Sequence, residues 1–438
     1  MANRHAAVLG AGALGLTAAL RLTQRGHRVT VFEREPVPGG LAAGFQPAGP
    51  DGPWLEKFYH HLFQSDRHAI RLINELGLGK DLTWHRPRTV VLYDGYLHQL
   101  DSPLSLLRFG PLPLWDRFRM GLALAYLKLL SGPDRLEGVR ASPWIRDQMG
   151  DRAADLVWDP LLRAKFGDHA DTIALPWFWA RVHDRTTRLG YLGGGFQRVY
   201  NALAAGVAAA GGAVHLGREV SRVQREGDRL TVTHQSASGD DSAQDVFDVI
   251  LSTLPTRLTA RIAPELPDDW RERHDPGPAL GAHCLVLALD RPLTDAYWVN
   301  LNDPGFPFLA LVEHTNMRSP AEYGGRHLVY LGSYRPMDDP VLKANPEQLL
   351  SDWLPALQRL NPKLDRSWVT QVWGFAAPFA QPIVTVDYAR HIPPFQTPAP
   401  GLWIANMFQV YPHDRGQNYS IELAERVVGA MGNGPGAT

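Results

Sequence analysis

The sequence predicts a two-domain α/β protein, and residues 6–41 carry most of that prediction. An apolar run at 6–9 leads into the glycine turn Gly10-Ala11-Gly12-Ala13-Leu14-Gly15. A helical pattern then continues to about residue 26, and a second apolar run at 28–32 ends at Glu33. Strand, glycine turn, helix, strand and acidic residue follow one another as in a βαβ dinucleotide site. At 438 residues the chain is also longer than one hydrophobic core usually allows.

Each residue of this turn has a physical task in such a site. Gly10 permits the tight turn out of the strand, Gly12 lets the backbone approach a pyrophosphate, and Gly15 lets the helix pack closely. The helix start directs free N–H groups toward phosphate oxygens. The Glu33 carboxylate is placed to accept hydrogen bonds from a ribose diol. A bare glycine motif can be an ordinary turn, but here the whole unit is in register.

A second glycine turn, Pro38-Gly39-Gly40-Leu41-Ala42, follows Arg34 and Glu35. A nicotinamide enzyme does not need a turn at this place. The segment resembles the flavoprotein superfamily of amine oxidases, phytoene desaturases and protoporphyrinogen oxidases, in which the second turn runs beside the FAD pyrophosphate and ribityl chain. The resemblance extends to UDP-galactopyranose mutase-type flavoproteins, and it implies FAD as the cofactor.

Two later motifs continue the resemblance. Residues 191–223 resemble the segment in which a glycine pair starts a helix and the next strand holds the adenine, which implies that Val220 binds it through backbone atoms. Thr253 stands where relatives pass a strand end over the cofactor. Residues 401–421 resemble the closing strand, turn and helix, whose first N–H groups face the flavin N1–C2 carbonyl. Asn406 replaces the family's usual acid, and its amide still suits the ribityl hydroxyls.

The predicted fold is therefore α/β, with a Rossmann-like FAD-binding domain and a discontinuous second domain of mixed sheet plus helices. The FAD-binding domain is expected to comprise 1–60, 187–255 and 383–438, and the substrate-binding domain 61–186 and 256–382. The predicted cofactor-binding residues are Gly10, Gly12, Ala13, Leu14, Gly15, Glu33, Arg34, Gly39, Gly40, Leu41, Val220, Thr253, Asn406, Gly416, Asn418 and Tyr419.

Composition narrows the remaining possibilities. A net charge of −1 gives no general attraction to nucleic acid, and we expect no nucleic-acid partner. The single cysteine, Cys284, excludes disulfides within the chain and cysteine-based metal clusters. His60 and His61 have no third ligand nearby in the sequence, so no metal is predicted. The chain start leaves no room for a signal peptide, and a cytoplasmic location is expected.

Residues 104–130 are strongly apolar and are interrupted by Arg108, Arg117, Arg119 and Lys128. Helices with one basic and one apolar face can lie on a membrane surface. They are also ordinary helices that cover a substrate cavity. Both interpretations stay open at this point, and the first adds peripheral membrane contact to the expected location.

The chemistry is predicted from the cofactor, because FAD performs the redox step and the protein presents the substrate to its N5 atom. Many amine-oxidising relatives use a lysine near N5, yet no lysine occurs between Lys165 and Lys343. We therefore predict oxidation or desaturation of a small, at least partly apolar substrate by hydride transfer. Tyr411, His413 and Arg415, beside the last motif, are candidate catalytic residues.

Two other functions compete with this prediction. The related sugar mutases and carotenoid isomerases use reduced FAD without net oxidation, and arginines of this chain could bind a phosphate or carboxylate on such a substrate. A flavin-containing binding or assembly protein, in which FAD is a structural element, is the alternative of another class.

Overall fold

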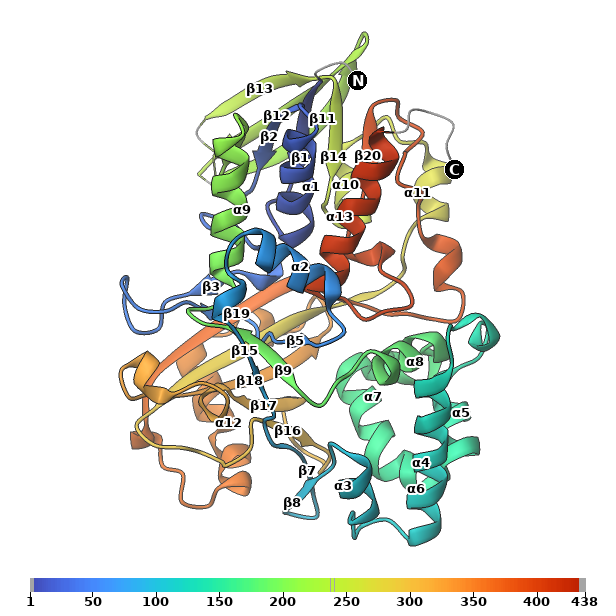
Figure 1. The fold of residues 1–438 in the computed structure, drawn as a ribbon, viewed down its shortest axis with the longest axis vertical. Helices are drawn as coiled ribbons and strands as arrows, with labels where there is room; N and C mark the ends of the chain where they lie inside the picture. Colours follow the sequence, from blue (N-terminus) through green and yellow to red (C-terminus); the bar gives the residue numbers. More distant parts are fainter. Residues whose placement is uncertain (1–3, 237, 240, 433–438) are drawn as a thin grey trace.

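A five-stranded parallel sheet lies at the centre of the first domain, in the upper part of Figure 1. The structure is a computed structural model and describes residues 4–236, 238–239 and 241–432. The ends of the predicted segments 1–60 and 383–438, at 1–3 and 433–438, lie outside the described residues. The strand order is β10 (Ala213–His215), β2 (Arg28–Phe32), β1 (His5–Leu9), β14 (Val249–Ser252) and β20 (Leu402–Ile404).

Alternate residues of these strands enter two different cores, because successive strand side chains point to opposite faces. Val8 of β1 packs with α1 (Ala13–Gln24), α9 (Gln197–Ala209) and α13 (Gln417–Gly432). Leu9 packs on the other face, where the antiparallel strands β11 (Arg218–Glu226), β12 (Arg229–Ser236) and β13 (Ser242–Phe247) lie. A sheet buried on both faces explains its nearly continuous apolar strands.

The second domain contains a seven-stranded sheet in which β16 and β7 pair in parallel and the other neighbours are antiparallel. The helix α12 (Pro346–Leu360) packs against it through Leu350, Trp353 and Leu357. The sheet order is β19 (Val369–Pro382), β15 (Ala279–Leu289), β18 (His327–Arg335), β17 (Ala310–Glu313), β16 (Trp298–Leu301), β7 (Thr89–Tyr93) and β8 (Tyr96–Gln99).

The turn between β7 and β8 confirms the Asp-Gly hairpin that the sequence predicts at 89–100. Asp94 and Gly95 have φ angles of 51° and 74°. Two successive positive φ angles match the right-handed twist of the strands, and the Asp-Gly pair tolerates them. Short strands complete the connections between the domains: β3 (Gly44–Phe45), β4 (Leu55–Glu56), β5 (Leu62–Phe63), β6 (Leu82–His85) and β9 (Leu189–Leu192).

A layer of helices with its own core occupies the lower right of Figure 1. The apolar stretch 104–130 forms two helices, because Gly110, Pro111 and Pro113 interrupt the chain between them. A π-helical segment, Ala154–Trp158, links two of the helices in this layer. The layer comprises α3 (Pro103–Leu107), α4 (Leu114–Leu129), α5 (Ala141–Met149), α6 (Asp151–Ala153), α7 (Asp159–Phe166) and α8 (Leu175–His183).

The structure confirms the predicted fold class, and it adds detail at the domain borders. The helices α10 (Thr256–Ile262) and α11 (Asp268–Arg273) share the core of β1 and β11–β13, although the predicted border lies at residue 255. The helix α2 (Arg67–Glu75) packs on α1 and α13, beyond the predicted border at residue 60. Among the described residues, no helix combines the length and apolar character that crossing a bilayer requires.

Candidate functional site

A cavity of about 770 Å³ lies where the carboxyl ends of the parallel strands meet the seven-stranded sheet. Leu9 is the last residue of β1, Glu33 and Thr253 follow the ends of β2 and β14, and all three line one side of the cavity. Ala282, Ser333 and Ala377, from β15, β18 and β19, line the opposite side. Ligands of open α/β sheets bind at the carboxyl ends of the strands, and this cavity has a volume typical of ligand pockets.

The two predicted glycine turns lie against each other at the cavity. Gly39 and Gly12 form a parallel bridge, and the N–H of Gly39 donates to the Ala11 carbonyl at 2.8 Å. A Cβ on Gly40 would lie 3.2 Å from the Gly12 Cα, and Gly40 itself has a φ of +58°. Side chains at these positions would fill the space in which a pyrophosphate must approach the protein backbone.

Gly15 has a different task from its neighbours. A Cβ on this residue would lie 1.9 Å from the Gly10 carbonyl oxygen, a distance that no real contact allows. Gly10 needs its own glycine character because its φ is +102°. Gly15 thus lets α1 begin directly behind the turn, so that the first N–H groups of α1 point past Gly12 into the cavity.

The Glu33 carboxylate is anchored before any ligand binds. One oxygen accepts the Ala11 N–H at 2.8 Å and the other accepts the Glu35 N–H at 3.0 Å. Each carboxylate oxygen keeps a free lone pair, because an ionised carboxylate accepts about four hydrogen bonds. Glu33 lines the cavity, so a ribose diol can use those lone pairs.

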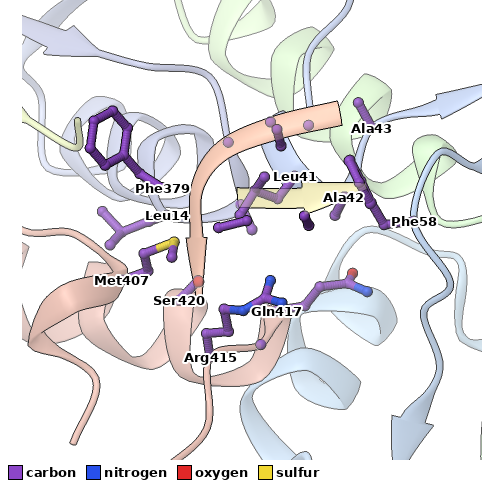
Figure 2. Close-up of a pocket in the computed structure, with 18 of the residues that line it drawn as sticks. Leu14, Leu41, Ala42, Ala43, Phe58, Phe379, Met407, Arg415, Gln417 and Ser420 are labelled. Atoms are coloured by element: carbon purple, nitrogen blue, oxygen red, sulfur yellow. The ribbon is translucent and has the colours of Figure 1, made fainter. Parts of the chain in front are cut away.

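The start of α13 supplies unpaired donors at the middle of the cavity wall. The first backbone bond of this helix runs from Ser420 N–H to the Gly416 carbonyl, so the N–H groups of 416–419 have no helical acceptor. The Gln417 Oε1 accepts the Tyr200 hydroxyl, whereas Nε2 is buried without a partner in the described structure. Figure 2 shows Gln417 and Arg415 at the cavity beside this helix start.

The cavity gathers most of the predicted cofactor-binding residues. Gly15 lies behind the turn as described, and it does not line the cavity. The roles of the others as FAD ligands stay predictions. Those that line the cavity are Gly10, Gly12, Ala13, Leu14, Glu33, Arg34, Gly39, Gly40, Leu41, Val220, Thr253, Asn406, Gly416, Asn418 and Tyr419.

Two of these side chains make protein contacts that the sequence did not reveal. Asn406 caps a 3₁₀ turn: its Oδ1 accepts the Phe408 N–H, and its Nδ2 donates to the Leu254 carbonyl at 2.9 Å and to Thr256 at 3.2 Å. Both amide protons are therefore used, and one lone pair of Oδ1 remains for a ribityl hydroxyl. Asn418 similarly accepts N–H bonds from the start of α2, so its backbone faces the cavity more freely than its amide.

Two of the three candidate catalytic residues, Tyr411 and His413, do not line the cavity. The Tyr411 hydroxyl donates to the Glu137 carboxylate at 2.7 Å, and this residue does not line the cavity. His413 lies behind the wall as well, with Nδ1 2.7 Å from Asp184 and its ring stacked on Tyr419. Arg415, the third candidate, does line the cavity, where it donates to Tyr334 and Gln381.

A buried charged cluster on the cavity wall was not predicted at all. Lys165 of α7 donates to Asp414 at 2.9 Å, and Arg181 of α8 lies 3.5 Å from the same carboxylate oxygen. Burial alone would raise the pKa of Asp414, but Lys165, Arg181 and Arg415 hold it far below its usual value. Burial lowers the pKa of Lys165. Asp414 keeps it paired, and hence the cluster is an ionised network.

Arg185, directly after α8, adds a further positive charge to the same wall. The Arg185 side chain is exposed to solvent and lines the cavity. Burial lowers the pKa of His60 to about 4 and of His61 to about 3, so both histidines lining this region are neutral. Among the described residues, no group of three metal-binding side chains comes together.

Sequence reasoning missed this cluster because its members come from distant segments. Lys165 and Asp414 are 249 residues apart, and each belongs to a segment that reads as ordinary helix or loop. Helix α7 brings Lys165, which stands at the border of the lysine-free segment, to the cavity. The absence of a lysine between Lys165 and Lys343 therefore does not leave the cavity without one.

The fold and the cavity define a dinucleotide-cofactor protein whose second domain forms one side of the cofactor cavity. The chain belongs to the family of flavin containing amine oxidoreductases, whose model matches residues 15–413. This match confirms the resemblance stated from the sequence, and FAD is the cofactor.

Individual relatives are distant. The 15-cis-phytoene desaturase of Solanum lycopersicum is 24% identical over 291 residues, which cover 60% of this chain and 48% of that protein. The chain thus spans about half the length of the curated relatives it matches. A putative protoporphyrinogen oxidase from Exiguobacterium has the same fold, with a TM-score of 0.76, 17% identity and coverage of 98% and 99% of the two chains. Reduced UDP-galactopyranose mutase superposes with a TM-score of 0.73, 15% identity and coverage of 99% and 96%.

The residues present fit FAD. The paired glycine turns and the start of α1 offer free N–H groups for a pyrophosphate, and Glu33 offers acceptors for a ribose. The start of α13 offers donors for the electron-rich edge of the flavin ring.

Proposed function

We propose that the protein is a desaturase- or oxidase-type enzyme that removes hydride from a C–H bond of a small, partly apolar molecule. The observation that carries this proposal is the continuity of the cavity. It extends from the glycine turns to a wall of the second domain in which apolar side chains such as Phe58, Leu309 and Phe379 predominate. Bound FAD supplies the hydride acceptor.

The protein's own residues position the substrate and shape the charge around it. Apolar side chains exclude water and bind the body of the substrate, and Figure 2 shows Phe379 and Phe58 among the side chains that line the cavity. The N–H groups at 416–419 would hold the electron-rich edge of a bound flavin. The ionised Asp414 network holds Lys165 and Arg181 in fixed positions on this wall.

The test uses the purified protein with its flavin. We expect one FAD for each chain, full reduction by light under anaerobic conditions, and rapid reoxidation by a benzoquinone. A flavin that cannot be reduced and reoxidised would contradict the enzyme function. That outcome would instead favour the alternative in which FAD is a structural element of a binding or assembly protein.

A non-redox isomerase or mutase is the second candidate, and the cationic wall favours it. Arg181, Arg185 and Arg415 at one cavity suit the phosphates of a nucleotide-linked substrate. The two candidates differ in the oxidation state they require. Turnover only after dithionite reduction, without consumption of a quinone, supports the isomerase, and turnover coupled to quinone consumption supports the oxidoreductase.

We also propose that the surface of α3 and α4 contacts a lipid bilayer. Leu107, Leu114, Trp115, Phe118 and Leu129 are each more than half exposed there. Residues 104–130 do not line the cavity, so these helices do not form its lid. A row of exposed apolar and aromatic side chains on an amphipathic helix is typical of binding at the membrane interface.

A further inference from the structure

The cavity wall beside the start of α13 carries more positive than negative charge. Lys165, Arg181, Arg185 and Arg415 line it, and the carboxylates that line the same region are Asp414, Asp184 and Asp66, of which Asp66 accepts the Phe63 N–H. Burial would raise the pKa of Asp184, but hydrogen bonds from His413 and Tyr419 lower it, so Asp184 is ionised and already in use. Asp414 likewise serves Lys165 and Arg181.

Arg185 differs from the other cations of this wall, each of which has a hydrogen-bond or ion-pair partner. In the part of the chain that the structure describes, its guanidinium has no hydrogen-bond or ion-pair partner, and its nearest recorded contact is the Phe63 ring at 5.8 Å. An arginine that lines a cavity without a counter-ion keeps its hydrogen-bond donors free for an anion. A ligand anion that enters the cavity can therefore reach the Arg185 guanidinium.

The place of Arg185 argues against a role toward the cofactor phosphates. The glycine turns and Glu33 belong to β1, β2 and the start of α1 in the parallel-sheet domain. Arg185 follows α8, whose buried face belongs to the core of the helical layer. The phosphate site and Arg185 are thus parts of different domains that meet at the cavity.

We propose that the substrate carries an anionic group, a carboxylate or a phosphate, which Arg185 and Arg181 bind while the apolar wall holds the rest of the molecule. This inference rests on the proposed function, because it names the substrate class of the same cavity. A planar guanidinium pair matches both oxyanions in bidentate geometry. The same wall repels an ammonium group, so an amine is not the substrate despite the family's description.

The test compares four ligands that share an octyl chain: octanoate, octyl phosphate, 1-octanol and octylamine. Each is titrated into the FAD-loaded protein, and binding is followed by isothermal calorimetry and by the change in flavin absorbance. We expect octanoate or octyl phosphate to bind at least about tenfold more tightly than 1-octanol, which is about 1.4 kcal/mol. Octylamine should bind more weakly than 1-octanol. The better of the two anions identifies the carboxylate or the phosphate as the natural group.

Substitutions assign the preference to its residue. Arg185→Gln removes the charge without breaking an internal ion pair, so it should fold and should lose most of the anion preference. Arg185→Lys should keep part of it. Arg188→Gln is the matched control, because Arg188 is exposed three residues later and does not line the cavity.

Two results would overturn the inference: equal or tighter binding of octylamine, or an anion preference that Arg185→Gln leaves unchanged. Failure of the proposed function looks different. A flavin that does not cycle with light and quinone would refute the oxidoreductase while leaving the ligand order intact.

Discussion

Gly15 is the position where one added methyl group tests the whole cofactor site. In Gly15→Ala the new Cβ would lie 1.9 Å from the Gly10 carbonyl oxygen, whereas real contacts of this kind stay above 3.0 Å. The first turn of α1 must therefore move away from the glycine turn by about 1 Å, which is the difference between these two distances. Overpacking of this kind costs about 1–3 kcal/mol.

The same movement weakens FAD binding, because the N–H groups of α1 leave the positions where they reach the pyrophosphate. Hydrogen bonds to charged groups contribute about 1.5–3 kcal/mol each. Loss of one such bond raises the Kd for FAD about tenfold or more. The apoprotein is titrated with FAD and followed by flavin fluorescence, and the free energy of unfolding is measured in urea.

Gly429→Ala is the matched control. Gly429 lies within α13, and a Cβ there meets nothing within 4 Å. Alanine at a compatible glycine position stabilises a protein by about 0.4–1 kcal/mol. If Gly15→Ala bound FAD within about twofold of the wild type and unfolded at the same urea concentration, the close approach of α1 to the turn would not be what builds the site.

Three further predictions address the charged cluster, a buried acid and the exposed helix. Asp414→Asn leaves Lys165 and its neighbours uncompensated and should lower the free energy of unfolding by about 3–5 kcal/mol in urea. Burial raises the pKa of Glu56 to about 7. The free energy of unfolding of the wild type should therefore fall by about 3 kcal/mol as the pH rises from about 4.5 to about 7. Urea titrations across this pH range should show that Glu56→Gln removes this loss. Trp115→Ser combined with Phe118→Ser should abolish sedimentation with vesicles of phosphatidylcholine and phosphatidylserine.

Each of these predictions has a control or a contrary result. Arg163→Gln breaks a pair with Asp171 that is largely exposed, so it should leave stability nearly unchanged. The sign for Glu56 follows from its raised pKa: the unfolded chain releases the proton first, and each step up in pH then favours unfolding. An equal effect of Glu56→Gln at pH 5 and pH 8 would contradict it. Wild-type protein that stays in the supernatant with these vesicles would refute the membrane proposal.

Much of the cofactor domain was predictable because its signals are local. The glycine turns, the helix behind them and Glu33 lie within residues 10–40, where backbone geometry dictates the residue type. The Asp-Gly hairpin at 94–95 was predictable for the same reason. The exposed face of the apolar stretch 104–130 was less predictable, since only the packing of α4 on α5 and α8 shows which side chains stay exposed.

The substrate side depended on contacts between segments that are far apart in the sequence. Tyr411 and His413 stand next to the last motif, yet they lie outside the cavity lining. There Tyr411 is hydrogen-bonded to Glu137, and His413 to Asp184. The sequence does not show a protein partner for the Asn406 amide. In the fold, this amide donates both of its protons, to the Leu254 carbonyl and to the Thr256 hydroxyl.

By itself, then, the sequence determined the glycine turns and helix starts of the predicted cofactor site, because a glycine or a helix start acts through the backbone of its own neighbourhood. The tertiary structure decided which charged side chains line the rest of the cavity. The charged cluster forms only where α7, α8 and the start of α13 meet, and its members are Lys165, Arg181, Arg185 and Asp414. Electrostatic interactions depend on distance and burial and not on separation along the chain.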